Sequence, residues 1–524
     1  MNRLNDKLMR KCAVILLAVL AVAVYIWCFD SKIDLNGDNA TYISLARNLA
    51  SGQGYSDMAY GGAFVPASQF PPGYPFLLSL MVRLGLDSIV AFKILNGVLL
   101  MISLLLVFLL FRGLTGSFPF ACLITLLCLA APRLVRFATI VMSETGYMTF
   151  ILLAFFALWR VSKGGGRFGP WFWVASVSAV ASYYFRGLGI SVMAAVIIFF
   201  LFRKEWLRAG VSAVSQLLLI LPWTLRNRAL GIESRYLDTV SMVNPWRPEQ
   251  EQVGGVGDFI KKAWVNLYDT TLNGFRRILF PGSCPSWDDG IVWISVITGI
   301  AILAVVVYGL WRMKPLRFAL LTFLAANIAI FMAWHSGNDF RYAVPYIPII
   351  VSGFWYGLKC LLERCFKNFN PAFVLAPLAA VSLFLSGPEL RVWHRVAEIG
   401  YPEEYVTYFD LAQKIESINP TPGEISDVAI CCRKPELFHY FAPSFYCCNY
   451  PYTSDTREMA KFFLDRKIGL VVVDMFGYSS TDHYLLPAIT GMQEYLSLLF
   501  EGDDHSLLFA IDLKGLASRY GDGL

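Results

Sequence analysis

Two acidic residues and two arginines are the side chains of this sequence best suited to chemistry. Asp38 lies at the head of the polar stretch DNATYISLARNLASGQGY, and Glu144 follows RLVRFATIVMS. Arg186 and Arg341 each lie at the edge of a long apolar run. A carboxylate can take a proton from a nucleophile, and fixed guanidinium groups stabilise the charge on a departing phosphate. These residue types favour a reaction in which an acceptor is deprotonated and a phosphate leaves.

Each of these residues also has a structural explanation. The residues around Tyr42 are expected to form an amphipathic helix that lies on the membrane surface, and capping of that helix would by itself explain Asp38. Glu144 in the first turn of a helix is favoured by the helix dipole, and Arg186 can extend to lipid headgroups. Arg341 is harder to explain in this way, because a cation in a first turn opposes the dipole. We therefore expect an anionic group close to Arg341.

The composition places the elements that carry these residues in a membrane. Of 524 residues, 56% are apolar and only 16% are charged, against about a quarter in soluble globular proteins. The net charge of +6 comes from short Lys and Arg clusters between apolar runs, which is typical of cytoplasmic loops and does not indicate nucleic acid. The GGGR sequence at 164–167 lacks the Lys and Ser or Thr of a phosphate-binding loop. A soluble nucleotide donor is therefore not indicated.

Apolar runs of helical length recur from residue 12 to about 386 and predict about eleven transmembrane helices. They lie at residues 12–29, 89–111, 118–132, 143–161, 170–184, 188–202, 209–225, 290–311, 318–334, 342–358 and 372–386. The stretch 170–202 could form one tilted helix, but only two helices that break near Arg186 and Gly187 keep every later basic cluster on one side. We therefore predict a multi-pass protein of the plasma membrane, the inner membrane in a bacterium, with a cytoplasmic N-terminus and an outer C-terminus.

This topology predicts two domains. Residues 1–386 form a transmembrane domain with long outer loops at 30–88 and 226–289, and residues 387–524 form a small outer α/β domain. Within the outer domain, strands are expected at 427–432, 468–474 and 506–513, and a helix at 456–466. Four of its cysteines, Cys431, Cys432, Cys447 and Cys448, are expected to form one or two disulfides between the two pairs, with the pairing left open. Cys284 has no assignable partner.

Several short motifs follow one another along the chain. They are Asp38 and Tyr42, the Gly52-Gln53-Gly54-Tyr55 sequence, Pro71-Pro72, Ser143-Glu144, Leu221-Pro222-Trp223, Arg226-Asn227, and Arg341-Tyr342 with Pro345 and Pro348. In the order of these motifs, the chain resembles the GT-C superfamily. The specific resemblance is to the bacterial family 39 type glycosyltransferases, which are related to protein O-mannosyltransferases and the lipid A aminoarabinose transferase. The resemblance covers most of the chain. Aminoarabinose-type members carry Lys immediately before the Pro-Pro pair, whereas this chain has Phe70 preceded by Gln69. This difference argues against the donor and acceptor of the aminoarabinose transferase as the substrates of this chain.

The resemblance implies transfer of a sugar from a polyprenyl phosphate to a lipid, glycan or protein acceptor on the outer face, normally with inversion. Asp38 is then expected to be the base, and Glu144 a supporting acid that positions the acceptor or a metal. We add Arg186 and Arg341 as contacts to the lipid phosphate. Further substrate-binding candidates are Tyr42, Tyr55, Gln69, Pro72 and Tyr342.

The sequence assigns no cofactor. It allows a divalent cation but does not identify the residues that would bind it. The alternative functions are a multispan secondary transporter, a lipid flippase and a non-catalytic sensor. Against transport, no internal repeat and no ionisable residue at mid-span is found in the sequence. The sugar and the acceptor are not readable from these residues.

Overall fold

The computed structural model describes residues 2–59, 62–232, 240–241, 253–282, 291–334, 340–419 and 425–521, without the side chains of residues 2–6 and 340. Two compact units make up the chain. The helical unit comprises residues 1–31, 68–74 and 88–398, and the C-terminal unit comprises residues 32–67, 75–87 and 399–524. Most of the first predicted loop, 30–88, therefore belongs to the same unit as the C-terminal residues. Cys284 and much of the predicted loop 226–289 lie outside the described residues.

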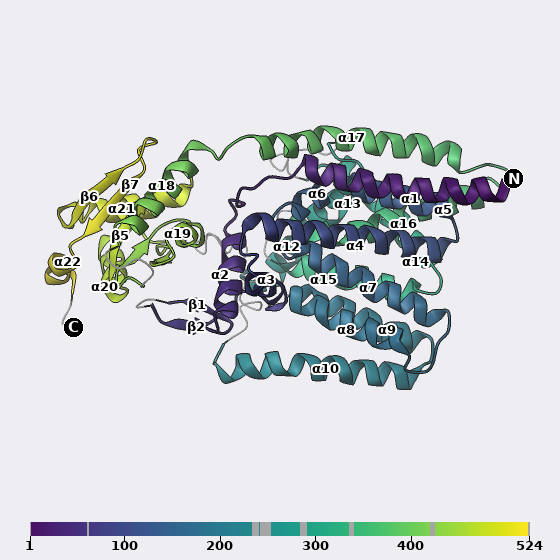
Figure 1. Cartoon of the computed structure of the whole chain (residues 1–524), viewed down its shortest axis with the longest axis horizontal. Coiled ribbons are helices and arrows are strands. Elements are labelled where there is room, and N and C mark those ends of the chain that lie inside the picture. The colour runs from purple at the N-terminus through teal and green to yellow at the C-terminus, as the bar shows by residue number, and fades with distance from the viewer. Residues whose placement is uncertain are drawn as a thin grey trace. The chain divides into compact units, whose positions relative to one another are not determined.

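Long helices lie side by side in the helical unit (Figure 1). Its helices are α1 (Asn2–Trp27), α4 (Ile89–Thr115), α5 (Phe118–Leu129), α6 (Pro132–Ala138), α7 (Glu144–Ser162), α8 (Pro170–Phe185), α9 (Ile190–Phe202), α10 (Trp206–Ala229), α12 (Val256–Leu267), α13 (Gly274–Leu279), α14 (Trp293–Arg312), α15 (Arg317–Ala333), α16 (Ile347–Cys365) and α17 (Ala372–Glu398). A 3-10 segment, η5 (Phe340–Tyr346), precedes α16. Helix α17 continues past residue 386, where the sequence predicts the outer domain to begin.

The helical unit is that of a multi-pass membrane protein. Within the described residues, seven helices are long and apolar enough to cross a membrane, or eight if the bent pair α5 and α6 is one span. A helix is present at every one of the predicted spans. Helices α8, α9 and α15 have 16, 13 and 17 residues, which is fewer than the roughly 20 that usually cross a membrane. Along one edge of the unit, α10 exposes Leu217, Leu218 and Leu225, each more than half accessible (Figure 1). Such a face is stable only against lipid.

Local sequence sets the ends of these helices. Helix α4 begins after Ser88, whose side chain accepts a hydrogen bond from the Ala91 amide at 3.2 Å. The predicted break near Arg186 is confirmed: α8 ends at Phe185, Arg186 is extended with φ −152°, and α9 begins at Ile190. The predicted span 118–132 is shorter than expected, because the chain bends by 65° between α5 and α6, where Pro132 cannot continue the hydrogen bonds of α5.

Glycines allow two of the membrane helices to touch. A Cβ atom added at Gly309 of α14 would lie 1.9 Å from the Gly353 carbonyl oxygen of α16, and one at Gly357 would lie 2.2 Å from the Val305 oxygen. Gly353 and Gly357 are spaced as in the small-residue motif that brings membrane helices together. The close approach of α14 and α16 therefore depends on glycine at these positions.

A five-stranded sheet forms the centre of the C-terminal unit, with strand order β4-β3-β5-β7-β6. The strands are β3 (Ala429–Cys431), β4 (Tyr446–Cys448), β5 (Ile468–Val473), β6 (Leu496–Glu501) and β7 (Leu507–Ile511). The helices of the unit are α2 (Asp38–Ala50), α3 (Gly73–Arg83), α18 (Glu403–Ser417), α19 (Pro435–Phe441), α20 (Thr456–Asp465), α21 (Leu486–Thr490) and α22 (Leu513–Tyr520), with α3 beginning in the helical unit. A separate hairpin pairs β1 (Ser56–Met58) with β2 (Phe64–Pro66). The three predicted strands and the predicted helix 456–466 are confirmed, whereas β4, β6 and the hairpin are not anticipated by the sequence.

Helix α2 differs from its prediction in its surroundings. It begins at Asp38, as expected, but Tyr42 is 2% exposed and Leu45 is fully buried. The helix packs against α19 and β1 of its own unit. The prediction that its apolar stripe lies on the membrane surface is therefore wrong, because protein covers that stripe instead.

Candidate active site

Glu144 is held in place by the chain segment that precedes it. The side chain of Asn96, fully buried on α4, donates hydrogen bonds to the backbone oxygens of Ile140 at 2.6 Å and Met142 at 3.1 Å. Tyr74 donates in turn to the Asn96 side-chain oxygen at 3.2 Å. These bonds fix the turn that leads into α7, whose first residue is Glu144. Nothing in the sequence pattern identified Asn96, because a polar residue within an apolar run carries no signal of its partner.

Two arginines from distant parts of the chain converge on Glu144. The Arg186 Nη1 atom lies 2.8 Å from Glu144 Oε1 and 3.1 Å from Ser143 Oγ. The Arg341 Nε atom lies 2.6 Å from the same Glu144 oxygen. Arg186 comes from the break between α8 and α9, and Arg341 comes from η5. The anion that the sequence predicts beside Arg341 is therefore Glu144.

The Glu144 carboxylate is enclosed by protein. Its side chain is fully buried, while those of Arg186 and Arg341 are 12% and 20% exposed. Oε1 accepts from both arginines, which uses the two lone pairs of that oxygen. Oε2 is buried and has no hydrogen-bond partner among the residues that the structure describes. The Glu144 carboxylate therefore joins two cations that come from distant parts of the chain.

The cluster of Glu144, Arg186 and Arg341 carries two positive charges and one negative charge. Both cations are guanidinium groups, whose planar N–H donors match the oxygens of a phosphate. Tyr342 lies beside the cluster, with Arg186 5.6 Å from the centre of its ring. A phosphate group has the charge and the acceptor oxygens that match this arrangement.

The Pro-Pro turn approaches the same part of the helical unit. Pro72 is partly buried and directly precedes Gly73, where an added Cβ atom would lie 2.7 Å from the Tyr184 carbonyl oxygen. Tyr184 belongs to the last turn of α8, two residues before Arg186. Gln69 is exposed. The turn therefore packs on the end of α8 only because position 73 has no side chain.

Asp38, the predicted base, lies in the C-terminal unit together with Tyr42 and Tyr55. Gly37 is the cap residue of α2, with φ +87° and no side-chain capping bond, so Asp38 is the first residue inside the helix. The negative charge of Asp38 is one cause of a raised pKa at Glu436, and the charge of Glu436 is one cause of a raised pKa at Asp57. Tyr42 is buried, whereas Tyr55 is partly exposed. The two carboxyl groups Glu436 and Asp57 were not among the predicted site residues.

Burial and negative neighbours raise the pKa of both Glu436 and Asp57. Burial raises the pKa of Glu436, and the charge of Asp38 raises it further. Burial, with a contribution from Glu436, raises the pKa of Asp57 to about 6. The described residues contain no group of three or more His, Cys, Asp or Glu side chains arranged to hold a metal ion. The structure therefore assigns no ligands to the divalent cation that the sequence leaves open.

Comparison with known proteins gives structural matches only. No protein-family model and no curated protein matches the sequence. Among solved structures, the chain is similar to ArnT from Cupriavidus metallidurans bound to undecaprenyl phosphate, with a TM-score of 0.59 and 12% identity over 95% of this chain and 97% of that one. It is also similar to the oligosaccharyltransferase AglB from Archaeoglobus fulgidus in complex with an inhibitory peptide and a dolichol-phosphate, with a TM-score of 0.60 and 11% identity over 97% of this chain and 74% of that one. The chain therefore shares the fold of these two proteins.

This match confirms the predicted fold class, a polytopic helical membrane protein of GT-C type with a small C-terminal α/β region. At 11 and 12% identity it establishes the fold alone. The roles of individual GT-C site residues in this chain stay predictions.

Proposed function

We propose that this chain is an integral membrane glycosyltransferase that moves a sugar from a polyprenyl phosphate to a lipid, glycan or protein acceptor. The supporting observation is the cluster of Glu144, Arg186 and Arg341, in which a buried carboxylate holds two guanidinium groups side by side. It occurs in the fold of ArnT and AglB, two proteins whose structures contain undecaprenyl phosphate and dolichol-phosphate. The phosphate of such a lipid is the anion that we assign to this cluster.

In the proposed reaction, Asp38 takes the proton from the acceptor hydroxyl or amine. The freed oxygen or nitrogen then forms a bond to the anomeric carbon of the sugar. The bond between that carbon and the phosphate oxygen breaks, and its electron pair leaves with the lipid phosphate. Arg186 and Arg341 stabilise the charge on that phosphate, and a direct displacement of this kind inverts the anomeric carbon.

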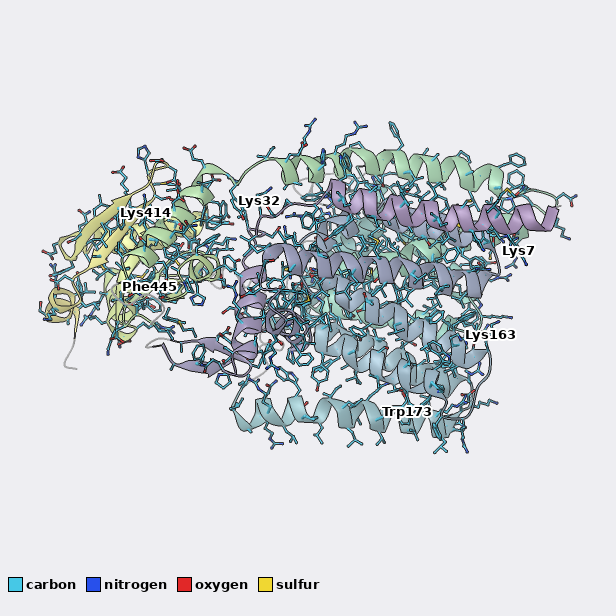
Figure 2. The ribbon with its side chains drawn as sticks, viewed as in Figure 1. Lys7, Lys32, Lys163, Trp173, Lys414 and Phe445 are labelled. Carbon is cyan, nitrogen blue, oxygen red and sulfur yellow. The ribbon has the colours of Figure 1, made fainter. Side chains whose placement is uncertain are left out.

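We further propose that the reaction takes place on the outer side of the plasma membrane, the inner membrane in a bacterium. The two basic side chains labelled Lys7 and Lys163 lie at the same end of the helical unit (Figure 2). Clustered basic residues at one end indicate the cytoplasmic side. The N-terminus would then be cytoplasmic.

Complementation of a deletion strain tests this function. Glycolipids and glycoproteins of intact cells are compared by mass spectrometry after complementation with the wild type, Asp38→Asn, Arg341→Gln or Arg133→Gln. We expect Asp38→Asn to lower the product by about a hundredfold or more, because general base catalysis contributes at least that much. Arg133→Gln is the matched control, because Arg133 pairs with Glu389, 3.3 Å away, and not with Glu144.

Arg341→Gln should lower the product as well, and in membranes it should raise the concentration of lipid donor needed for half-maximal rate. Full product from the Asp38→Asn strain, at normal protein level, would contradict the proposed role of Asp38. A deletion strain whose glycans are all unchanged would contradict the proposed function as a whole.

A further inference from the structure

Three side chains near the C-terminal sheet contact alternate residues of the segment that leads into Asp38. The Tyr401 hydroxyl accepts from the Ile33 amide at 2.7 Å and donates to the Ile33 oxygen at 3.3 Å. Lys434 Nζ donates to the Leu35 oxygen at 3.1 Å. Each contact is to the backbone, so each fixes the path of the chain and not the identity of its side chains.

The third contact brings a charged group next to Asp38 itself. The Glu436 Oε2 atom lies 3.4 Å from the position that a Cβ atom would take at Gly37. Gly37 has φ +87°, a left-handed conformation that glycine adopts without strain. The Glu436 carboxyl group therefore lies against the backbone turn that places Asp38 at the beginning of α2.

The charged surroundings of Glu436 combine both signs. Asp38 from α2 and Asp57 from β1 are the negative neighbours that interact with it. Lys434 and Arg433, which precede α19, are the positive neighbours, and the thiol of Cys447 on β4 also senses its charge. Burial and the charge of Asp38 raise the pKa of Glu436, whereas the two cations oppose that rise.

We propose that Glu436 is a positioning residue for Asp38: its carboxyl group sets the charge that Asp38 faces, while Tyr401 and Lys434 hold the turn that carries Asp38. The C-terminal unit then contributes side chains that act on the base. This inference rests on the proposed role of Asp38 as the base.

The sign of the expected pH effect follows from the charges. Below its raised pKa, Glu436 is protonated and neutral, and above that pKa it is negative. A negative charge beside the base attracts the proton that is being transferred, so ionisation of Glu436 should increase the rate of acceptor deprotonation. In Glu436→Gln the neighbour is neutral at every pH, and this increase is absent.

The first experiment measures kcat as a function of pH for the wild type, Glu436→Gln and Tyr401→Phe. The ratio of wild-type to Glu436→Gln kcat should be near one at the acid end and should grow to about threefold or more at alkaline pH. Tyr401→Phe removes a backbone contact without changing any charge, so it should lower kcat by the same factor at every pH. A Glu436→Gln profile that runs parallel to the wild-type profile would overturn the proposal.

The second experiment does not depend on turnover. Infrared titration of the purified protein follows the carbonyl band of a protonated carboxyl group, and the band that Glu436→Gln removes belongs to Glu436. In Asp38→Asn this band should disappear at lower pH than in the wild type, because a negative neighbour has been removed. Asp87→Asn is the control, because Asp87 pairs with Arg47 at the surface, 3.0 Å away.

The two measurements separate two kinds of failure. If the wild type transfers no sugar but the Glu436 band shifts in Asp38→Asn, the proposed function fails while the charge coupling stands. If the band has the same midpoint in the wild type and in Asp38→Asn, Glu436 does not sense Asp38, and the inference fails whatever the enzyme does.

Discussion

At the scale of single residues, Glu144 is a buried acid that links two distant arginines. Its fully buried side chain places one oxygen against two guanidinium groups. The sequence offers two explanations of Glu144: a favourable helix dipole, and a supporting acid that positions the acceptor or a metal. The structure adds a contact that neither explanation names, the shared hydrogen bonding of Arg186 and Arg341 to one Glu144 oxygen.

Removal of the Glu144 carboxylate should therefore destabilise the protein. In Glu144→Ala, the guanidinium groups of Arg186 and Arg341 lose the carboxylate that both contact, and breaking a buried ion pair costs about 3–5 kcal/mol. We expect a clear fall in the temperature of thermal unfolding in detergent. Glu389→Ala is the control, because its pair with Arg133 is partly exposed and is expected to contribute less than about 1 kcal/mol. Equal falls in the two variants would contradict this account.

At the scale of elements, the edge of the C-terminal sheet brings its four cysteines together. Strands β3 and β4 are parallel, with Cys431 and Cys448 in register. Burial and the neighbouring Cys448 thiol raise the pKa of Cys431, and burial and the neighbouring Cys432 thiol raise the pKa of Cys447. All four are free thiols in the structure. The arrangement selects one pairing from those that the sequence left open.

On an oxidising side of the membrane, we expect disulfides between Cys431 and Cys448 and between Cys432 and Cys447. Adjacent strands lie about 4.8 Å apart, which suits a disulfide. Each bond forms when two thiols give two protons and two electrons to a disulfide oxidant. Mass spectrometry of unreduced peptides identifies the pairs, and Cys128, buried in α5, should stay a thiol. Four alkylated cysteines at these strands, or a bond between neighbours in sequence, would contradict this prediction.

At the scale of the whole molecule, the proposed function requires Asp38 to lie outside the cell membrane. Ser51, just after α2, and Cys365, at the end of α16, are both exposed and are predicted to lie on opposite sides. An even number of spans between them would place both on the same side. Labelling therefore tests the predicted topology directly.

A membrane-impermeant maleimide applied to intact cells should label Ser51→Cys, and Cys365 should be labelled only after permeabilisation. Proteolysis and mass spectrometry then locate the label, so that the native cysteines need not be removed. Labelling of Cys365 but not of position 51 in intact cells would reverse the topology and rule out the proposed outer site.

The sequence by itself determined the elements whose signal is local. Apolar runs located the seven described helices that are long enough to cross a membrane. The requirement for a common side of the basic clusters located the break at Arg186, and short apolar runs located β3, β5 and β7. Strands of three residues, such as β4, are too short to show a period. The amphipathic stripe of α2 was visible, but a stripe is the same whether lipid or protein covers it.

Only the tertiary structure decided which of these elements meet. No pattern in the sequence brings Arg186 and Arg341 to one oxygen of Glu144, or Asn96 to the turn before it. Likewise, nothing near Asp38 in the sequence indicates that Glu436, from the far end of the chain, lies against Gly37. Hydrophobic periodicity depends on neighbours along the chain, whereas the charge and hydrogen bonding of a buried polar group depend on neighbours in space.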